Sequence, residues 1–150
     1  MNTPSQLCTF VVDKFFFGVD VQMVQEVLRY QEMTRVPLSP KVIAGLINLR
    51  GQIVTAIDLR KRLDLGEPDS GYVPMNVVVR SDDMPISFLV DEIGDVLEVD
   101  AAAFERCPDM LSGVARDVIT GVYKLEERLL LVLDVEKTVD LSAKRVRSEV

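Results

Sequence analysis

One hairpin-like pattern occurs twice in this chain, and this repeat constrains the fold more than any other feature. Segments 45–58 and 121–134 both begin with glycine, carry leucine at the same internal position and end with aspartate, with apolar residues between. Apolar runs on either side of a short turn are typical of β-hairpins. Positions shared by both copies are those that packing requires, so any specific function is expected where the copies differ. They differ most at the tip, which is Asn48, Leu49, Arg50 and Gly51 in the first copy and residues 124–127 in the second.

The composition indicates a globular protein that forms one compact unit or two small subdomains. The chain has 150 residues, of which 48% are hydrophobic and 27% charged, and its net charge is −7. An acidic chain repels phosphate backbones and anionic membranes, so we expect no nucleic-acid partner and no direct membrane contact. No apolar run reaches the roughly 20 residues that span a bilayer, and the N-terminus lacks signal-peptide features. A cytoplasmic location is therefore predicted.

The residue types provide little for enzymatic chemistry. The chain contains no histidine, which removes the commonest proton shuttle and metal ligand at neutral pH. It has no glycine-rich phosphate loop, and Cys8 and Cys107 form no close-spaced pair. Adjacent carboxylates at 82–83, 91–92 and 126–127 are expected to face water in turns. We therefore predict no catalytic residue, no cofactor and no metal site; an enzyme would need two of these acids to converge in a pocket.

The first part of the chain predicts short strands, one helix and the first hairpin. A tight turn at residues 13–14 separates the strand-forming runs 7–12 and 15–19. A helix is expected over residues 21–30, with an aspartate before it as N-cap and an apolar stripe along one side. One helical turn is expected at 59–63. Alternation along the second strand places Phe15 and Phe17 in the core, where Cys8 of the first strand is also expected. Phe16, on the other face, either covers the second barrel, which we favour, or remains exposed as a contact surface.

A cluster of turn-forming residues at 67–71 divides the chain into two parts. The second part resembles the first again, because Phe-Leu-Val-Asp at 88–91 matches Phe-Gly-Val-Asp at 17–20. Both similarities occur in the same order, which predicts two similar β-units. The other elements expected in the second part are strands at 75–80, 85–91 and 95–99, a loop at 109–117, a hairpin at 118–134 and a terminal helix at 136–143.

The predicted fold class is mostly β, with two small five-stranded barrels and short helices. Many short strands with turn signals between them favour small barrels over a parallel sheet. The first barrel is expected at approximately residues 15–66 and the second at approximately 72–135. Strand 7–12 and the tail 136–150 are the segments that could cross from one barrel to the other.

The tip of the first hairpin combines residue types that can organise a binding site. Gly51 can adopt the positive φ that a two-residue turn requires. Asn48 is unusual in a strand, and its amide is expected to organise the tip by hydrogen bonding. Glu26, on the polar side of the expected helix, is a candidate partner for Arg50, because a guanidinium matches a carboxylate. The residue types leave open whether this pair is a local structural ion pair or part of a partner-binding surface.

Several runs of residues resemble those of a known family. They are Phe-Gly-Val-Asp-Val at 17–21, Val-Gln-Glu-Val-Leu at 24–28, Leu-Ile-Asn-Leu-Arg-Gly at 46–51 and Ile-Asp-Leu-Arg at 57–60. In this order they closely resemble the CheW family of bacterial chemotaxis coupling proteins. The similarity covers approximately residues 7–140.

The resemblance implies two SH3-like barrels packed on a shared core, and no catalytic activity. Family members couple transmembrane chemoreceptors to the CheA-type histidine kinase, whose regulatory domain has the same fold. The implied partners are this regulatory domain and the receptor's helical-hairpin tip, which binds in a groove between the barrels. The positions that match the family's receptor-binding surface are Val24, Glu26, Asn48, Arg50 and Gly51, while Met110 and Leu111 lie where the second-barrel loop meets the kinase.

The resemblance also implies a location in the cytoplasm with recruitment to membrane-associated receptor arrays. Coupling proteins serve sister pathways as well, such as pilus or gliding control. In that alternative the chain is a regulatory binding module without direct chemoreceptor contact.

Overall fold

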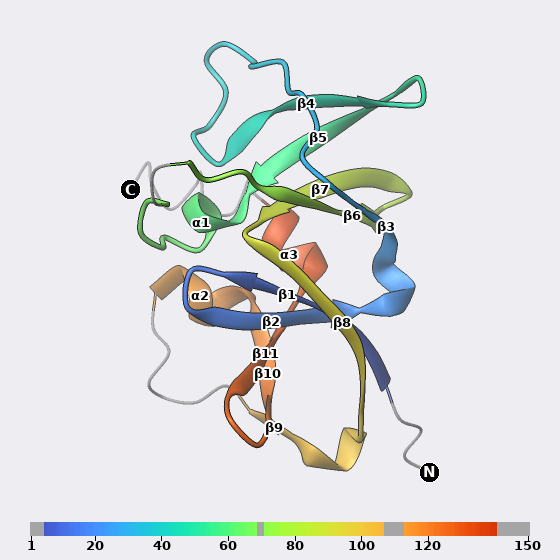
Figure 1. Cartoon of the computed structure of the whole chain (residues 1–150), viewed down its shortest axis with the longest axis vertical. Coiled ribbons are helices and arrows are strands. Elements are labelled where there is room, and N and C mark those ends of the chain that lie inside the picture. The colour runs from blue at the N-terminus through green and yellow to red at the C-terminus, as the bar shows by residue number, and fades with distance from the viewer. Residues whose placement is uncertain (1–4, 69–70, 107–112, 141–150) are drawn as a thin grey trace.

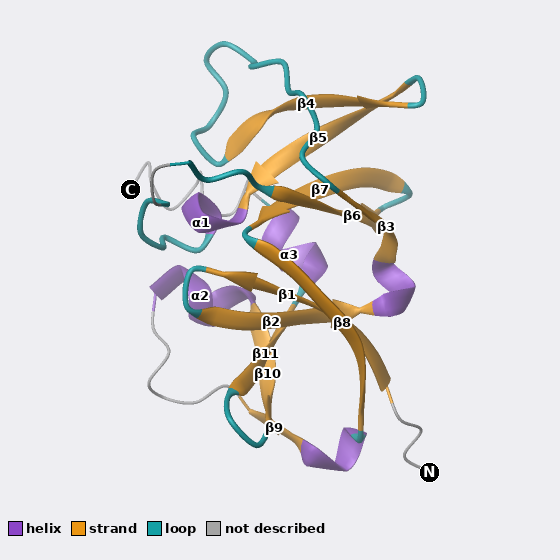
Figure 2. Ribbon diagram, viewed as in Figure 1, coloured by secondary structure: helices purple, strands orange, loops and turns teal. Residues whose placement is uncertain are grey.

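The computed structural model describes residues 5–68, 71–106 and 113–140 of the chain. Strands dominate these residues, and the helices are short (Figure 2). The strands form two sheets, which lie one above the other in Figure 1. The helical elements of the described ranges are the 3₁₀ turns η1 (Val21–Met23) and η2 (Ala101–Ala103) and the helices α1 (Leu59–Arg62), α2 (Gly113–Val118) and α3 (Val135–Val139).

The lower sheet in Figure 1 combines strands from the two ends of the described chain. It has six strands in the order β8-β1-β2-β11-β10-β9. Its neighbouring strands are antiparallel except for β2 and β11, which are parallel. The strands are β1 (Ser5–Val12), β2 (Phe15–Asp20), β8 (Glu92–Val99), β9 (Phe104–Arg106), β10 (Ile119–Lys124) and β11 (Leu129–Leu133).

The upper sheet contains the middle of the chain. It has five strands in the order β3-β6-β7-β5-β4, with β5 and β7 as its parallel pair. Both sheets run from one edge strand to another rather than closing completely, and this mostly β, SH3-like architecture confirms the predicted fold class. The strands are β3 (Val24–Leu28), β4 (Ile43–Leu49), β5 (Gln52–Asp58), β6 (Met75–Ser81) and β7 (Met84–Val90).

The two halves of the chain exchange their first hairpins. β1 and β2 come from the first half but lie between β8 and β11 of the second half. Reciprocally, β6 and β7 of the second half lie among β3, β4 and β5 of the first. The sheets therefore differ from the expected barrels at 15–66 and 72–135. The difference arises because the two outer strands of a hairpin carry unpaired N–H and C=O groups. These groups can pair with any strand that lies close in space, whatever its distance along the chain.

Side chains from both sheets meet in one central core. Strand alternation sends neighbouring residues to different clusters, because successive side chains point to opposite faces. Val77 and Val79 face the central core, whereas Val78 faces a second cluster inside the five-stranded sheet. This double burial explains why strands such as β6 and β11 are continuous apolar runs. The largest side chains of the central core are Phe10, Phe17, Ile57, Leu59 and Phe88.

The repeated hairpins have the same register, which confirms the repeat found in the sequence. Gly45 lies opposite Ala56, and Gly121 lies opposite Val132, at matching positions of the two hairpins. A shift in register precedes the glycine in both. The aspartate that closes each hairpin caps the following helix through its side chain, α1 in one case and α3 in the other. The helical turn expected at 59–63 is thus confirmed as α1.

The helix predicted over residues 21–30 is wrong. Only Val21–Met23 form a 3₁₀ turn, and the chain then continues as β3. β3 pairs antiparallel with β6, which lies about fifty residues further along the chain. Valines suit a pleated strand better than a helix, so long-range pairing prevails over the helical spacing of the apolar residues.

The aromatic residues of β2 follow the prediction in part. Phe17 is buried in the central core, and Phe16 packs on the opposite face against Leu130 of β11, so both predictions are confirmed. Cys8 is buried as expected. The prediction for Phe15 is wrong, because 37% of its surface is exposed. Phe15 begins β2 directly after the tight turn, where the core no longer covers it.

The other elements that the sequence predicts agree with the structure within a few residues, whereas η2 and β9 are not among them. β8 begins earlier than expected, at Glu92, and α2 replaces part of the loop expected at 109–117. The expected terminal helix corresponds to α3; residues 141–143 of that prediction, and Cys107, lie outside the described residues. No helix in the described ranges is long and apolar enough to cross a membrane.

Candidate functional site

The tip of the β4–β5 hairpin is a tight turn with a defined backbone. Leu49 pairs with Gln52, and the two residues between them have positive φ angles, 50° for Arg50 and 87° for Gly51. Two successive positive φ angles match the right-handed twist of the flanking strands. The Oδ1 atom of Asn48 accepts a hydrogen bond from the backbone N–H of Gly51 at 2.9 Å. The amide of Asn48, an exposed residue, therefore organises the tip, as the sequence predicts.

An ion pair connects this tip to the opposite edge of the same sheet. Arg50 donates from Nη2 to Oε2 of Glu26, which lies on β3. The two side chains differ in exposure, with 70% of Arg50 and 21% of Glu26 accessible. The expected pairing of these residues is thus confirmed, although Glu26 belongs to a strand and not to a helix. The exposed guanidinium retains N–H donors for a partner.

The Arg50–Glu26 pair lies where the five-stranded sheet curls and its two edges approach each other. β3 and β4 are the two edge strands, and the chain after β3 also bridges to β4. There Thr34 donates to the carbonyl of Leu46 at 2.9 Å and accepts from its N–H at 2.8 Å. The β4–β5 hairpin is consequently attached to β3 by the Arg50–Glu26 contact and to the segment after β3 by the backbone bridge, which limits its freedom relative to the rest of the sheet.

Val24 does not join the other predicted receptor-binding residues at the tip. It pairs with Val79 and packs against the central core, whereas Glu26 pairs with Val78, which faces the other cluster. A β-bulge between Val24 and Glu26 causes this change of face. The structure thus brings together four of the predicted residues, Glu26, Asn48, Arg50 and Gly51. Met110 and Leu111, the predicted kinase contacts, lie outside the described residues.

Two further polar residues, Gln25 and Arg80, are connected to the tip but are not predicted as site residues from the sequence. Gln25, the extra residue of the bulge, donates from Nε2 to Oε2 of Glu26 at 3.5 Å. Its Oε1 accepts from Nη1 of Arg80, on β6, at 2.7 Å. Nothing in the local pattern indicates this contact, because β3 is expected to be a helix and Arg80 is distant in sequence. Knowledge of the β3–β6 pairing is the only signal that could have revealed it.

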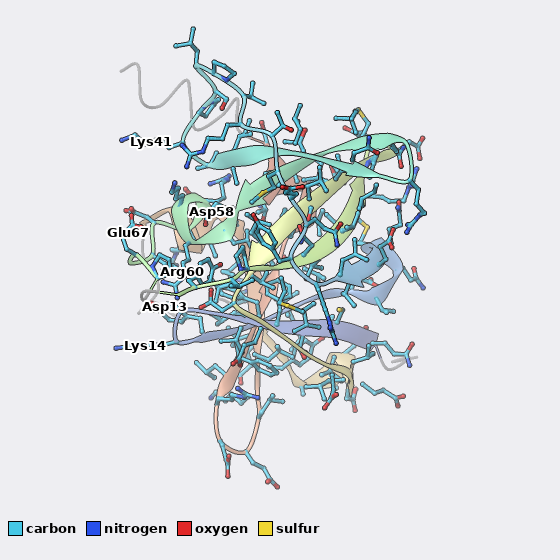
Figure 3. The ribbon with its side chains drawn as sticks, turned by 45° about the horizontal axis from the view of Figure 1, so that its top comes forward. Asp13, Lys14, Lys41, Asp58, Arg60 and Glu67 are labelled. Atoms are coloured by element: carbon cyan, nitrogen blue, oxygen red, sulfur yellow. The ribbon has the colours of Figure 1, made fainter. Side chains whose placement is uncertain are left out.

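A second charged cluster lies away from the tip, around Arg60 of α1 (Figure 3). Arg60 is nearly buried and donates to both oxygens of Asp91, from Nε at 3.1 Å and from Nη2 at 2.7 Å. It also donates to the carbonyl of Gly66 at 2.7 Å, while Asp91 accepts from the backbone N–H of Asp13 at 2.7 Å. The hydrogen bond to Asp91 raises the pKa of Arg60 above its ordinary value. This cluster joins three separate segments, which indicates a structural role.

Tyr72 borders the same cluster. The guanidinium carbon of Arg60 lies 5.5 Å from the centre of the Tyr72 ring, within the range of a cation–π contact. Burial, followed by the nearby Asp91 carboxylate, raises the pKa of Tyr72 above its ordinary value. Tyr72 therefore remains a neutral phenol at physiological pH. At that pH the side chain is therefore not a phenolate nucleophile.

Comparisons with known proteins agree over nearly the whole chain. The model of the CheW-like domain matches residues 6–143. The chain is 32% identical over 143 residues to a chemotaxis protein CheW of Bacillus subtilis, covering 93% of this chain and 90% of that protein. It is 30% identical over 136 residues to a chemotaxis protein CheW of Treponema pallidum, covering 88% and 80%. The scaffolding protein TtCheW from Thermoanaerobacter tengcongensis has the same fold, with a TM-score of 0.83 at 24% identity over 92% of this chain and 94% of that one.

Proposed function

The chain belongs to the CheW-like family. We therefore propose that it couples chemoreceptors to a CheA-type histidine kinase. The family's members are chemotaxis scaffold proteins, so the role assigned here is binding and not catalysis. The proposed partners are the regulatory domain of the kinase and the cytoplasmic hairpin tip of the receptor. The protein acts in the cytoplasm and is recruited to membrane-associated receptor arrays through these contacts.

The observation that carries this proposal is the organised, charged tip of the β4–β5 hairpin. Asn48 and Gly51 hold the turn, and Glu26 orients Arg50, whose side chain is 70% exposed. A pre-oriented guanidinium binds a partner with less loss of side-chain entropy than a free one. We assign receptor binding to these four residues together with Val24. Contact with the kinase through Met110 and Leu111 is proposed from the family resemblance alone.

Reconstitution of the three-component system tests the function as a whole. We expect the receptor to change kinase autophosphorylation when this chain is present and to have no effect when it is omitted. Receptor control of the kinase that does not depend on this chain would contradict the proposal. Copurification with the kinase but with no chemoreceptor would instead support a regulatory module of a sister pathway.

The substitution Arg50→Glu tests the receptor-binding surface. It reverses the charge at the tip and places a second carboxylate beside Glu26, so we expect receptor affinity to fall about tenfold or more. Stability should change by less than about 1 kcal/mol, because an exposed turn charge contributes little. Pull-down with a receptor cytoplasmic fragment measures binding, and circular dichroism measures folding. Lys14→Glu, which makes the same charge change at the β1–β2 turn, is the matched control; unchanged binding by the Arg50 variant would contradict the site.

A double-mutant cycle tests whether Glu26 and Arg50 act as one unit. The variants Glu26→Gln, Arg50→Gln and their combination are compared in receptor affinity. If Glu26 serves to orient Arg50, each single change weakens binding and the double change adds little to either. Losses that simply add would show two independent contacts.

A further inference from the structure

A chain of polar contacts extends the Arg50–Glu26 pair across the sheet. Arg50 and Gln25 both donate to the same oxygen of Glu26, and Arg80 donates to Gln25 at 2.7 Å. A second donor of Arg80, Nη2, binds the carbonyl of Asp83 at 3.0 Å. The contacts therefore run from the β4–β5 tip over β3 to the β6–β7 turn. We refer to Arg50, Glu26, Gln25 and Arg80 as the polar rim.

The β-bulge in β3 makes this rim possible. In a regular strand, the adjacent Gln25 and Glu26 would point to opposite faces. Here Gln25 is the unpaired residue between two ladder positions, so its side chain is redirected toward that of Glu26. Arg80 is anchored at its other end by the β6–β7 turn, where Asp82 and Asp83 have positive φ angles of 50° and 62°. Both guanidiniums of the rim are thus attached to tight, defined turns.

Arg80 has capacity for a further contact. It is exposed, and its two hydrogen bonds use only part of the five N–H donors of a guanidinium. Both of its acceptors are neutral, an amide and a backbone carbonyl, and Arg80 forms no salt bridge with a side chain in the described part of the chain. Arg50 already shares its charge with Glu26. A charge that is oriented but not neutralised favours a carboxylate supplied from outside.

We propose that Arg80 is a second cationic contact of the partner-binding surface, that Gln25 positions it, and that the docked receptor hairpin presents a carboxylate to it. This inference rests on the function proposed above and deepens it. Arg50 contacts Glu26 directly and Arg80 is linked to it through Gln25, so the rim selects a partner with an acidic group near the residue that meets Arg50. The net charge of −7 repels an anionic partner on average, so contact with an acidic group depends on local cations such as those of the rim.

Affinity measurements at low and high ionic strength test the proposal with the intact chain and a cytoplasmic hairpin fragment of a chemoreceptor from the same genome. Arg80→Ala should weaken binding about threefold to tenfold and make affinity less dependent on salt, because one exposed ion pair is lost. Arg80→Lys should retain the salt dependence and part of the affinity. Lys14→Ala removes the same charge from a side chain that points away from the body (Figure 3) and should change neither quantity.

The positioning role of Gln25 has a separate readout. Gln25→Ala should weaken binding in the natural chain and should have no further effect when Arg80 is already alanine. Full affinity and unchanged salt dependence in the Arg80→Ala variant, with binding lost in Arg50→Glu, would overturn this inference and leave the proposed function intact. Equal weakening of Arg80→Ala at all salt concentrations would also overturn it, since that result indicates a purely structural residue. Full binding by Arg50→Glu would reject the proposed function itself.

Discussion

Arg60 illustrates, for a single residue, how this fold accommodates a buried charge. Its guanidinium forms a two-pronged contact with Asp91 and a third hydrogen bond to the Gly66 carbonyl. Removing a charge from water is unfavourable, and only good geometry with further hydrogen bonds compensates for it. The same carboxylate also accepts from the N–H of Asp13, so one pair fixes α1, the end of β7 and the β1–β2 turn.

We expect Arg60→Met to lower the free energy of unfolding by about 3 kcal/mol, because Asp91, whose side chain is only 15% exposed, loses its cationic partner. Urea denaturation followed by circular dichroism measures this change. The neighbouring Lys61 is exposed, so Lys61→Met should change stability by less than about 0.5 kcal/mol. If both variants unfold at the urea concentration of the natural chain, the pair does not stabilise the fold.

At the scale of elements, the repeated hairpins share a packing requirement as well as a register. A Cβ atom on Gly45 would lie 2.7 Å from the carbonyl oxygen of Thr34, and one on Gly121 would lie 2.4 Å from that of Glu105. In both repeats the absence of a side chain on the glycine therefore lets the backbone of a neighbouring segment approach closely. The segment at Thr34 bridges to β4, and that at Glu105 is β9, which pairs with β10. Glycine at this place reflects a close approach of two backbones.

Gly45→Ala should destabilise the protein by about 1 to 3 kcal/mol, because the methyl group meets backbone and not a flexible side chain. Thermal or urea unfolding measures the loss. Gly66→Ala is the matched control, since no atom lies within 4 Å of a Cβ at Gly66. Equal stability of the two alanine variants would show that the Thr34 segment moves away without cost.

For the molecule as a whole, the exchange of hairpins makes the two halves interdependent. Each sheet is incomplete without strands from the other half, and the central core takes side chains from both sheets. The short helices add a further link, because Arg62 of α1 donates to the carbonyls of Thr138 and Lys137 in α3, at 2.7 and 2.9 Å. Unfolding one sheet would expose the core surface of the other, so we expect a single cooperative transition.

Cutting the chain between Glu67 and Gly71 tests this interdependence. We expect neither fragment to show cooperative unfolding alone, because each lacks strands that complete its sheets. Mixing the two in equal amounts should restore the β-type circular dichroism spectrum and a single transition, with intact chain refolded in the same way as the reference. A fragment that folds alone would show that the halves are independent units.

Local features could be predicted from the sequence because they depend on near neighbours. The backbone of the Arg50–Gly51 turn, the Asn48 hydrogen bond and the aspartate caps of α1 and α3 involve residues at most a few positions apart. The Glu26–Arg50 pair is an exception, found because few residue types match an exposed arginine and because a family resemblance pointed to both positions. The hairpin repeat was visible because the same packing demands the same residues twice.

Other features depend on which strands meet, and no local pattern contains that information. Residues 21–30 have helical spacing, yet β3 forms because β6 offers it an antiparallel partner strand. The expected barrels followed the order of the chain, whereas the observed sheets follow the exchange of hairpins. The Gln25–Arg80 contact exists only as a result of that pairing and of the bulge within it. Turn geometry is a short-range property of the backbone, but strand partners are chosen by the burial and hydrogen bonding of the entire chain.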